Sequence, residues 1–323
     1  MPNHFLGIDT SNYTTSAALV AYDGSEIRVL SDARRLLPVR PGERGIRQNE
    51  AVFHHTAAIG AVVREACAGV SEKNVRPEAV GVSTAPTGQE GSYMPCFSVG
   101  RAVAESLGAV TGAAVADFSH QQGHVAAVAF GAGRLDILRD EFIAFHVSGG
   151  TTEAVLVRPD RERVIACEKL SGSLDLKAGQ LIDRAGLMLG LSFPAGKELD
   201  ALARRGRSPV RPRVFIKDGW VSVSGAQNVF EKMLSDGESR ENAARYCVDY
   251  ICEAVRLMTT CALEKHPGLP VLYSGGVMSN SVISETLDGV FCPAYATDNA
   301  VGTAVLAALL AAGNDSPGTG PTP

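Results

Sequence analysis

A seven-residue segment near the start of the chain is repeated near its middle. Residues 14–20 read TTSAALV and residues 151–157 read TTEAVLV, so five of the seven positions are identical. An apolar stretch typical of a β-strand and a small polar or glycine turn precede each copy. Chance can produce one such match between β-rich segments, but each copy stands near the start of one half of the chain. The repeat therefore predicts two duplicated lobes, each with a strand–turn–strand hairpin facing a cleft.

Both halves alternate short apolar strands with amphipathic helices, which is the pattern of an α/β fold. A length of 323 residues suits two domains. We predict an N-terminal lobe over residues 1–138, completed by a last helix at 298–312, and a C-terminal lobe over residues 139–297. Residues 313–323 are mostly Gly, Pro, Ser and Thr and are predicted to be disordered.

The expected elements follow from apolar spacing and from turn residues. Residues 34–48, rich in arginine, are predicted to form a loop, and residues 206–240 show no clear pattern. Strands are predicted at 5–9, 14–22, 27–30, 80–84, 113–116, 142–148, 152–157, 164–169 and 271–273. Helices are predicted at 50–68, 99–107, 119–130, 176–189, 197–205, 241–265, 279–287 and 298–312.

The composition excludes several classes of protein. Hydrophobic residues make up 45% of the chain and charged residues 20%, which excludes disordered and collagen-like proteins. No apolar run approaches the ~20 residues of a membrane span. A net charge of -5 excludes a basic field over the whole surface but not a local basic patch. Seven cysteines without a Cys-x-x-Cys motif, and a start unlike a signal peptide, predict a cytoplasmic protein with reduced thiols.

His120 and His124 stand four residues apart in the helix predicted at 119–130, so their side chains share one face. Two neutral imidazoles on one face can bind a common Zn²⁺ or Fe ion, although they can also be histidines without a metal. Gln121 stands where a zinc protease of the His-Glu-x-x-His type has its general base, which argues against a peptidase. A third ligand must come from elsewhere. Asp298, at the start of the last predicted helix, is a candidate, but an aspartate there also suits an N-cap.

Two double-glycine turns follow predicted strands. Their residues are Ser148, Gly149, Gly150 and Thr151 in the first turn, and Gly275, Gly276 and Asn280 in the second. A strand that ends in a glycine turn before a helix can bind an anion or a nucleotide. Neither turn matches the dinucleotide fingerprint or the phosphate-binding loop with its lysine. Each could also be only a tight structural turn.

Two aspartates and two basic stretches are further candidates. Asp183 and Asp200 lie on successive predicted helices, where carboxylates beside a nucleotide could accept hydrogen bonds from ribose hydroxyls. The alternative is an ordinary exposed aspartate on a helix. Arginine-rich residues 204–217 and 34–47 could contact the phosphate backbone of a nucleic acid, or could be solvated surface.

Together these motifs resemble the tRNA threonylcarbamoyladenosine transferase family, TsaD, once named O-sialoglycoprotein endopeptidase. Six motifs occur in the order of that family, between Gly7 and about residue 308. They are residues 7–11, the pair His120 and His124, residues 148–152, Gly179 with Asp183 and residues 189–196, residues 275–277 with Asn280, and residues 297–300. The resemblance implies two duplicated lobes of the actin, sugar-kinase and heat-shock-ATPase type, with a central cleft between them.

The resemblance also implies ligands and an activity. His120, His124 and Asp298 would bind one divalent metal ion, Fe or Zn. An adenine nucleotide or adenylate would be bound by Ser148, Gly149, Gly150, Thr151, Asp183, Gly196, Asp200, Gly275, Gly276 and Asn280. The family transfers a threonylcarbamoyl group from its adenylate to N6 of adenosine 37 in tRNA. The implied partners are the adenylate donor, tRNA, and either family-type proteins or a homodimer or heterodimer, without a membrane.

The sequence departs from the family at several acidic positions. Where the family usually has Cys-Asp-Glu-Thr after the first serine, this chain has Asn12, Tyr13, Thr14 and Thr15. The family's Asp-Asp-Ala-x-Gly-Glu run is replaced by DLKAGQ at residues 175–180, with Leu176 and Gln180 at acidic positions, and Thr151 replaces a His or Asn. No catalytic residue is therefore assigned. The departures indicate a divergent paralogue. The alternatives are a non-catalytic nucleotide-binding scaffold and a carbamoyl transferase acting on a small molecule.

Overall fold

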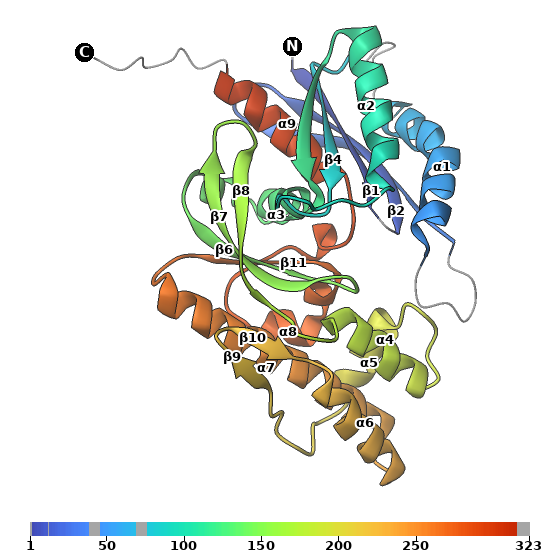
Figure 1. Ribbon diagram of the computed structural model, residues 1–323, viewed down its shortest axis with the longest axis vertical. Coiled ribbons are helices and arrows are strands. Elements are labelled where there is room, and N and C mark those ends of the chain that lie inside the picture. Colours follow the sequence, from blue (N-terminus) through green and yellow to red (C-terminus); the bar gives the residue numbers. More distant parts are fainter. Residues whose placement is uncertain (1, 12, 39–45, 69–75, 315–323) are drawn as a thin grey trace. The chain divides into compact units, whose positions relative to one another are not determined.

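The computed structural model describes residues 2–11, 13–38, 46–68 and 76–314 (Figure 1). The chain divides into two compact units. Unit 1 contains residues 1–130, 158–167 and 298–323, and unit 2 contains residues 131–157 and 168–297. Each unit is built around its own β-sheet and is described by itself.

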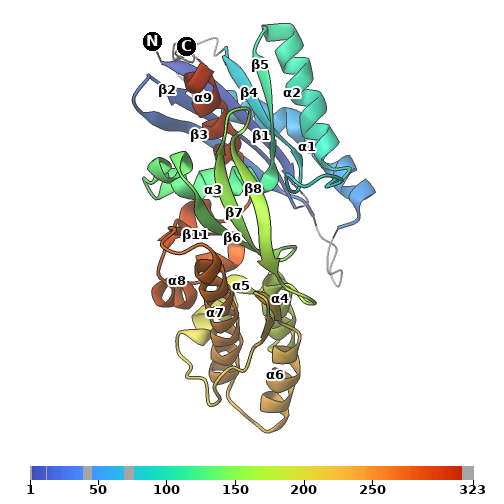
Figure 2. The same ribbon diagram turned by 60° about the vertical axis from the view of Figure 1, so that its left-hand side comes forward.

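Unit 1 has a five-stranded mixed sheet (Figures 1 and 2). Its strands are β1 (Asn3–Ser11), β2 (Thr14–Tyr22), β3 (Ile27–Leu36), β4 (Ala79–Ala85) and β5 (Ala114–Ser119), in the spatial order β3-β2-β1-β4-β5. The first three strands pair antiparallel, and β4 and β5 run parallel to β1. Both β1 and β2 are buried along most of their length, including the polar residues Asp9, Thr10, Ser11, Thr14, Thr15 and Ser16.

Helices cover both faces of this sheet. The helices α1 (Gln48–Ala68) and α2 (Phe97–Thr111) pack on one face, and α9 (Val301–Asn314) packs on the other (Figures 1 and 2). The helix α3 (His120–Gly131) follows β5 directly. Apolar side chains from β1, β2, β4, α1 and α2 form one core on the first face, including Leu6, Ile8 and Val62. The five-stranded sheet of unit 1 is thus buried between helices on its two faces.

Unit 2 repeats the strand order of unit 1. Its strands are β6 (Phe142–Val147), β7 (Thr152–Asp160), β8 (Val164–Gly172), β11 (Val271–Ser274) and β12 (Val290–Phe291), in the order β12-β11-β6-β7-β8. The strand β7 pairs antiparallel with β6, whereas β11 runs parallel to β6 and to β12. Strand for strand, this is the topology of β1 to β5. The predicted α/β fold with duplicated halves is confirmed.

The helices of unit 2 surround one long buried helix, α7 (Arg240–Lys265). The others are α4 (Ala178–Met188), α5 (Gly196–Ala203), α6 (Gly225–Ser235) and α8 (Ser281–Thr286). A small hairpin is formed by β9 (Phe215–Lys217) and β10 (Trp220–Ser222). The 3-10 helices are η1 (Leu135–Arg139), η2 (Gly276–Ser279) and η3 (Pro293–Tyr295). Aromatic and aliphatic side chains of α7, such as Tyr246 and Ile251, are almost fully buried in the core. None of the described helices combines the length and apolar character that a membrane span requires.

Several predicted boundaries were wrong. In two of the affected segments, a partner strand or a helix cap overrides the local sequence pattern. The loop expected at 34–48 is too long, because β3 continues beside β2 as far as the pair of Thr14 with Leu36, and α1 already begins at Gln48; residues 39–45 lie outside the described residues. The helix expected at 279–287 is the 3-10 helix η2 followed by the short α8. The helices break there because the Asn280 side chain accepts hydrogen bonds from the amides of Val282 and Ile283.

Other differences concern the ends of the chain and its least patterned part. The last helix begins at Val301, and it continues to Asn314, so residues 313 and 314 of the predicted tail are helical. Residues 315–323 of that tail lie outside the described residues. The stretch at 206–240, for which no element was predicted, contains the β9–β10 hairpin and α6. The strand β12 was not predicted either. The strands β9, β10 and β12 are only two or three residues long, which is too short for an alternation of apolar and polar residues to show.

Candidate functional site

Four titratable side chains meet in unit 1, from three separate parts of the chain. His120 and His124 lie on the first turns of α3, Asp298 lies three residues before α9, and Asp9 lies near the end of β1. The Nε2 atoms of His120 and His124 are 3.0 Å apart. Oδ1 of Asp298 lies 3.3 Å from Nε2 of His124 and 3.7 Å from Nε2 of His120. The structure therefore brings the three predicted metal ligands together.

The donor atoms of this cluster fit a divalent metal ion. Ligand atoms about 2.1 Å from a metal, at tetrahedral or octahedral angles, lie about 3.0–3.4 Å from one another. Two of the three separations fall in this range and the third is slightly wider. Two imidazole nitrogens and one carboxylate oxygen are donors that both zinc and iron accept. His120, His124 and Asp298 could hold such an ion without rearrangement of the backbone.

The carboxylate of Asp9 places a second negative charge, besides that of Asp298, next to His120. Its Oδ1 lies 2.9 Å from Nδ1 of His120, and its side chain is only 1% exposed. Burial raises the pKa of Asp9, but the positive charge and hydrogen bond of His120, together with the Ser83 hydroxyl, outweigh burial and hold that pKa below its usual value. Burial likewise disfavours charge on His120, yet the Asp9 and Asp298 carboxylates raise the pKa of His120 to about 9. Burial and the neighbouring His120 lower the pKa of His124.

Two glycines allow the helix with the histidines to approach the helix that follows Asp298. A Cβ atom at Gly302 would lie 1.8 Å from the backbone oxygen of Gly123, closer than any side chain tolerates. Gly123 in turn faces Thr303 across the same contact. The backbones of α3 and α9 can touch because neither residue has a side chain there. The contact thus joins the helix that carries the two histidines to the helix that follows Asp298.

The interpretation of Asp298 as a helix cap does not match the structure. The helix α9 begins at Val301, and the amide of Val301 donates to the side-chain oxygen of Asn299 at 3.0 Å. The carboxylate of Asp298 instead faces His124 and the hydroxyl of Thr14, which lies 3.5 Å from its Oδ2. Asn299 thus has the capping role, and Asp298 is available to the histidine cluster.

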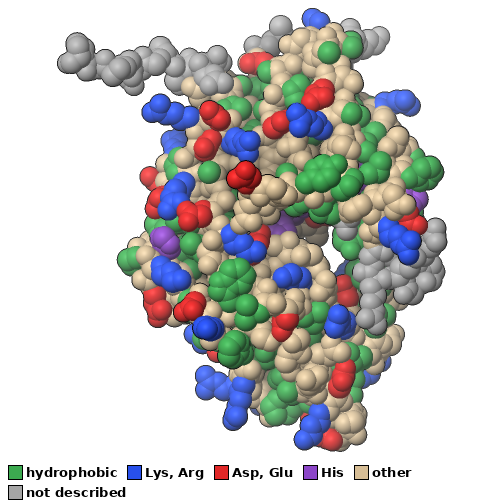
Figure 3. Space-filling view, in the orientation of Figure 1, with side chains coloured by type: hydrophobic (Ala, Val, Ile, Leu, Met, Phe, Trp, Pro, Cys, Tyr) green, Lys and Arg blue, Asp and Glu red, His purple; other side chains and the backbone are tan. Residues whose placement is uncertain are grey.

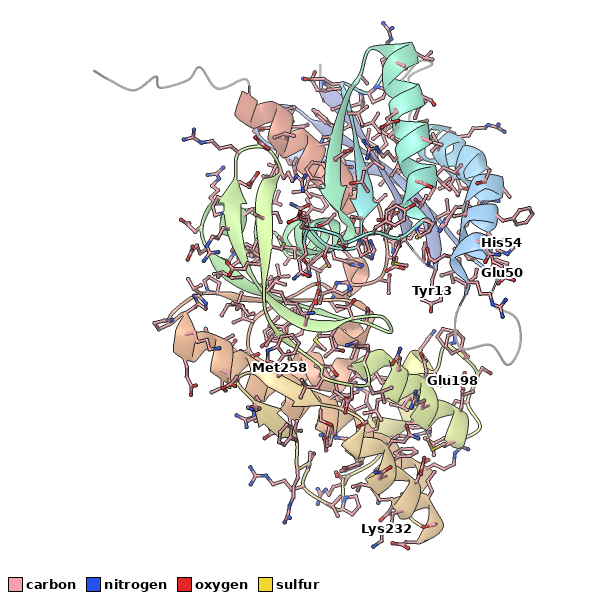
Figure 4. The ribbon with its side chains drawn as sticks, viewed as in Figure 1. Tyr13, Glu50, His54, Glu198, Lys232 and Met258 are labelled. Atoms are coloured by element: carbon pink, nitrogen blue, oxygen red, sulfur yellow. The ribbon has the colours of Figure 1, made fainter. Side chains whose placement is uncertain are left out.

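The β1–β2 hairpin presents no carboxylate at the two positions where the family usually has acidic residues. Thr14 is buried and its hydroxyl is close to Asp298. Tyr13 lies half-buried at the end of the hairpin, where Figure 4 labels it. Asn12 lies outside the described residues. In this part of unit 1, the acidic groups beside the histidines are Asp9 and Asp298.

The two double-glycine turns of unit 2 lie at the same edge of its sheet, because they follow the parallel strands β6 and β11. The first turn is closed by the Ser148 hydroxyl, which accepts hydrogen bonds from the amides of Gly150 and Thr151 at 3.3 and 3.2 Å. Gly149 and Gly150 are exposed, and nothing lies within 4 Å of a Cβ at either. Gly275 has φ +95°, and a Cβ there would lie 2.3 Å from the oxygen of Val147. Such an edge is the usual ligand site of α/β sheets.

The other residues predicted to bind the nucleotide lie at or near helix ends of unit 2, where three of them make hydrogen bonds within the protein. Asp183 accepts a hydrogen bond from the amide of Ala195, just before α5 begins, and burial raises its pKa. Asp200 accepts from the hydroxyl and the amide of Ser281 at the start of α8. Asn280 caps the same helix. Gly196 is the first residue of α5, with open space beside it, and Gly276 begins η2. The two aspartates and Asn280 therefore have structural partners, whatever else they bind.

The run at residues 175–180 lacks acidic residues at positions 176 and 180, yet both replacements make structural contacts. Leu176 is 7% exposed and packs in the core of unit 2. Gln180 accepts a hydrogen bond from the amide of Lys177 at 3.3 Å, as a glutamate does in a capping box at the start of a helix. An amide oxygen can accept this bond as a carboxylate does. These two replacements preserve α4 and remove negative charge.

Asp175, the acidic residue that remains in this run, fastens the start of α6. Its Oδ2 accepts hydrogen bonds from the hydroxyls of Ser222 and Ser224, both at 2.6 Å, and its Oδ1 accepts from the amides of Leu176 and Val223 at 2.6 and 2.8 Å. Partial burial raises the pKa of Asp175, but these hydrogen bonds outweigh burial and lower it to about 2. Asp175 is thus ionised and structural at neutral pH.

We expect Asp175→Ala to lower the free energy of unfolding by about 1.5 kcal/mol at pH 7, since bonds to a charged group are lost at an exposed position. Because the folded pKa lies below the unfolded value, this contribution exists above pH ~4 and disappears as the pH falls toward 2. Denaturant unfolding at several pH values measures it. Glu264→Ala, at an exposed position of α7, is the control. A stability difference between wild type and Asp175→Ala that stays constant from pH 7 to 2.5 would contradict the assignment.

The basic stretches contribute no single large patch on the face seen in Figure 3, where acidic and basic side chains are interspersed. Arg204 pairs with Glu285 and donates to Ser281. Arg205 lies 3.8 Å from Glu241, and Arg34 pairs with Asp32. Contact with a nucleic acid would have to compete with these ion pairs, which are weak at exposed positions.

Sequence reasoning missed Asp9 as a site residue, although the residue lies in a motif that was recognised. A carboxylate that ends a buried apolar strand was the available signal, since an aspartate is rarely fully buried without a partner. It also missed His55 on α1, which is buried with its Nδ1 2.8 Å from the Thr15 hydroxyl. His55 and its neighbour His54 stand in a helix without a recognisable motif, so the sequence gives no comparable signal.

Comparison with known proteins agrees with this arrangement of motifs. Residues 37–305 match the TsaD family, described as tRNA N6-adenosine threonylcarbamoyltransferase. A protein of that name from Streptococcus pneumoniae (strain Taiwan19F-14) is 28% identical over 295 residues, which span 88% of this chain and 83% of that protein.

Solved structures support the fold. T.kodakarensis HypF superposes with a TM-score of 0.59 at 13% identity, over 97% of this chain and 48% of that chain, so the chain spans about half the length of HypF. Component A of the Acidaminococcus fermentans (R)-2-hydroxyglutaryl-CoA dehydratase gives 0.54 at 14% identity, over 97% and 98% of the two chains. Because the family match covers most of the sequence and the identity to curated relatives is low, the chain belongs to the tRNA N6-adenosine threonylcarbamoyltransferase (TsaD) family as a divergent member.

Proposed function

We propose that this chain binds a divalent metal ion through His120, His124 and Asp298 and transfers a threonylcarbamoyl group from its adenylate to N6 of adenosine 37 in tRNA. The observation that carries the proposal is the convergence of two imidazole Nε2 atoms and one carboxylate oxygen within 3.0–3.7 Å. Family membership supplies the reaction and the two substrates.

The reaction forms a bond between N6 of the adenosine and the carbonyl carbon of the threonylcarbamoyl group. The bond from that carbon to the phosphate oxygen breaks, AMP leaves, and N6 loses a proton. A bound divalent cation supplies Lewis-acid stabilisation of the negative charge that develops on oxygen. The side chains of His120, His124 and Asp298 would hold that ion, and Asp9 would balance its charge.

Residues of unit 2 would bind the nucleotide part of the donor. The amides of Gly150 and Thr151 donate to Ser148, so in the first turn the amide of the exposed Gly149 would bind a phosphate, together with amides of the turn at Gly275 and Gly276. Asp183 and Asp200 lie on α4 and α5, next in the chain after these strands, where carboxylates could accept hydrogen bonds from ribose hydroxyls. Orientation of the donor by these groups would lower the entropic part of the barrier.

The test is a transfer assay with the purified chain, unmodified tRNA and an enzyme that makes threonylcarbamoyl-adenylate in situ. We expect the modified nucleoside in digested tRNA by mass spectrometry, and none in a tRNA with guanosine at position 37. Addition of a chelator should remove the activity. Absence of product from protein that binds both metal and adenine nucleotide would overturn the proposal. Carbamoylation of a small amine without tRNA would replace it by a different transferase activity.

A second candidate, a nucleotide-binding scaffold without turnover, is favoured by the hairpin. Tyr13 and Thr14 stand where the family usually has acidic residues, so these two positions provide no carboxylate that could take up the N6 proton. This candidate predicts a stable complex with an active family member and no product from the chain alone. Product formation that depends on His120 would exclude it.

A further inference from the structure

We propose that Asp9 is a positioning residue that fixes the orientation and tautomer of His120, so that its Nε2 faces the same metal ion as Nε2 of His124. The inference rests on the proposed metal site. It concerns how the ion is held, which the transfer reaction by itself does not reveal.

The carboxylate of Asp9 is held in place before any ion binds. Its Oδ2 accepts a hydrogen bond from the amide of Ser11 at 3.2 Å, and its backbone oxygen accepts from the Ser16 hydroxyl at 3.3 Å. The strand β1 is the central strand of its sheet, paired with β2 on one side and with β4 on the other. Oδ1 is thereby aimed at Nδ1 of His120. The orientation of the imidazole follows from a rigid part of the fold.

A second contact restrains the imidazole ring. Phe97, at the start of α2, lies with its ring centroid 6.1 Å from that of His120. The start of α2 is itself tied to β1, because the hydroxyl of Thr10 donates to the oxygen of Cys96 and accepts from the amide of Gly100. Neighbouring residues of a strand point to opposite faces of the sheet. Asp9 therefore contacts His120 directly, and Thr10 acts on it through the start of α2, which carries Phe97.

This arrangement determines which nitrogen of His120 is available to a metal. A carboxylate oxygen 2.9 Å from Nδ1 accepts a hydrogen bond from Nδ1–H, so the lone pair of the neutral ring is on Nε2. The Nε2 atom then lies beside Nε2 of His124 and Oδ1 of Asp298. Carboxylates in this outer position typically raise metal affinity 10–100-fold through ligand orientation and basicity.

The experiment compares Asp9→Asn with wild type and with Asp117→Asn, an aspartate of the same unit whose side chain is 42% exposed. Zn²⁺ affinity is measured by competition with a chromophoric chelator, and geometry by the absorption spectrum of bound Co²⁺. We expect Asp9→Asn to bind Zn²⁺ 10–100-fold more weakly with an altered Co²⁺ spectrum, and Asp117→Asn to match wild type. A folded Asp9→Asn with wild-type affinity and spectrum would overturn the inference.

A conservative variant keeps the test decisive if Asp9→Asn does not fold. Asp9→Glu keeps the charge but changes its reach by one methylene, so we expect an affinity between those of wild type and Asp9→Asn and a shifted Co²⁺ spectrum. An unchanged affinity and spectrum in Asp9→Glu would also overturn the inference.

The outcome is separable from that of the proposed function. Weaker Zn²⁺ binding by Asp9→Asn supports the positioning role even if wild type gives no product with tRNA. Product formation by wild type with unchanged Zn²⁺ binding in Asp9→Asn would support the function and contradict the positioning role.

Discussion

Asp298→Ala is expected to abolish transfer activity and to weaken Zn²⁺ binding more than 100-fold. The substitution removes the carboxylate that faces the paired Nε2 atoms of His120 and His124, at 3.7 and 3.3 Å. Loss of a direct ligand should exceed the 10–100-fold effect typical of residues that only orient a ligand. The side chain is 27% exposed, so its removal leaves no closed cavity in the core.

Three measurements on Asp298→Ala make this expectation specific. Metal content after dialysis and Zn²⁺ competition report binding, thermal unfolding reports the fold, and the digested-tRNA assay reports transfer. Asp117→Ala serves as the matched control and should equal wild type in all three. Wild-type Zn²⁺ affinity in Asp298→Ala would contradict the proposed site, and full transfer activity without bound metal would contradict metal dependence.

Gly302→Ala is expected to have the largest effect on stability. The added methyl group would lie 1.8 Å from the backbone oxygen of Gly123 and 2.9 Å from the amide nitrogen of Ala127. Neither atom belongs to a flexible side chain, so α3 and α9 must move apart. Overpacking of this kind costs about 3 kcal/mol. Since α3 carries the two histidines and Asp298 precedes α9, Zn²⁺ affinity should fall together with the unfolding temperature.

Gly60→Ala is the matched control for this substitution. Gly60 lies on the exposed side of α1, and nothing lies within 4 Å of a Cβ there. Alanine in a helix interior should stabilise the protein by about 0.5–1 kcal/mol. Thermal unfolding measures the stability of both variants, and Zn²⁺ titration measures their metal affinity. A Gly302→Ala protein that melts and binds Zn²⁺ like wild type would show that the contact between α3 and α9 does not set the geometry of the site.

Much of the fold follows from local sequence. The strand β2 has the predicted bounds, since its nine residues are a continuous apolar and β-branched run before a turn. The long helix α7 was predicted to within one residue. In the structure it begins after Ser239, whose hydroxyl accepts a hydrogen bond from the amide of Asn242. The helix α6 and the short strands β9, β10 and β12 were missed, because their positions depend on contacts such as that of Asp175 with Ser224. Local pattern is weakest where an element is held by distant residues.

The sequence by itself determined which residues could bind a metal and that the chain has two similar halves. The spacing of His120 and His124 places both imidazoles on one helix face, and this follows from helix geometry alone. That Asp298 lies beside His124, and that Asp9 contacts His120, was decided only by the tertiary structure. These residues are separated from the histidines by more than one hundred positions, and the close contact of α3 with α9 and the position of β1 bring them together. Helix and strand propensities and hydrophobic periodicity depend on neighbouring residues, so they do not predict such a long-range contact.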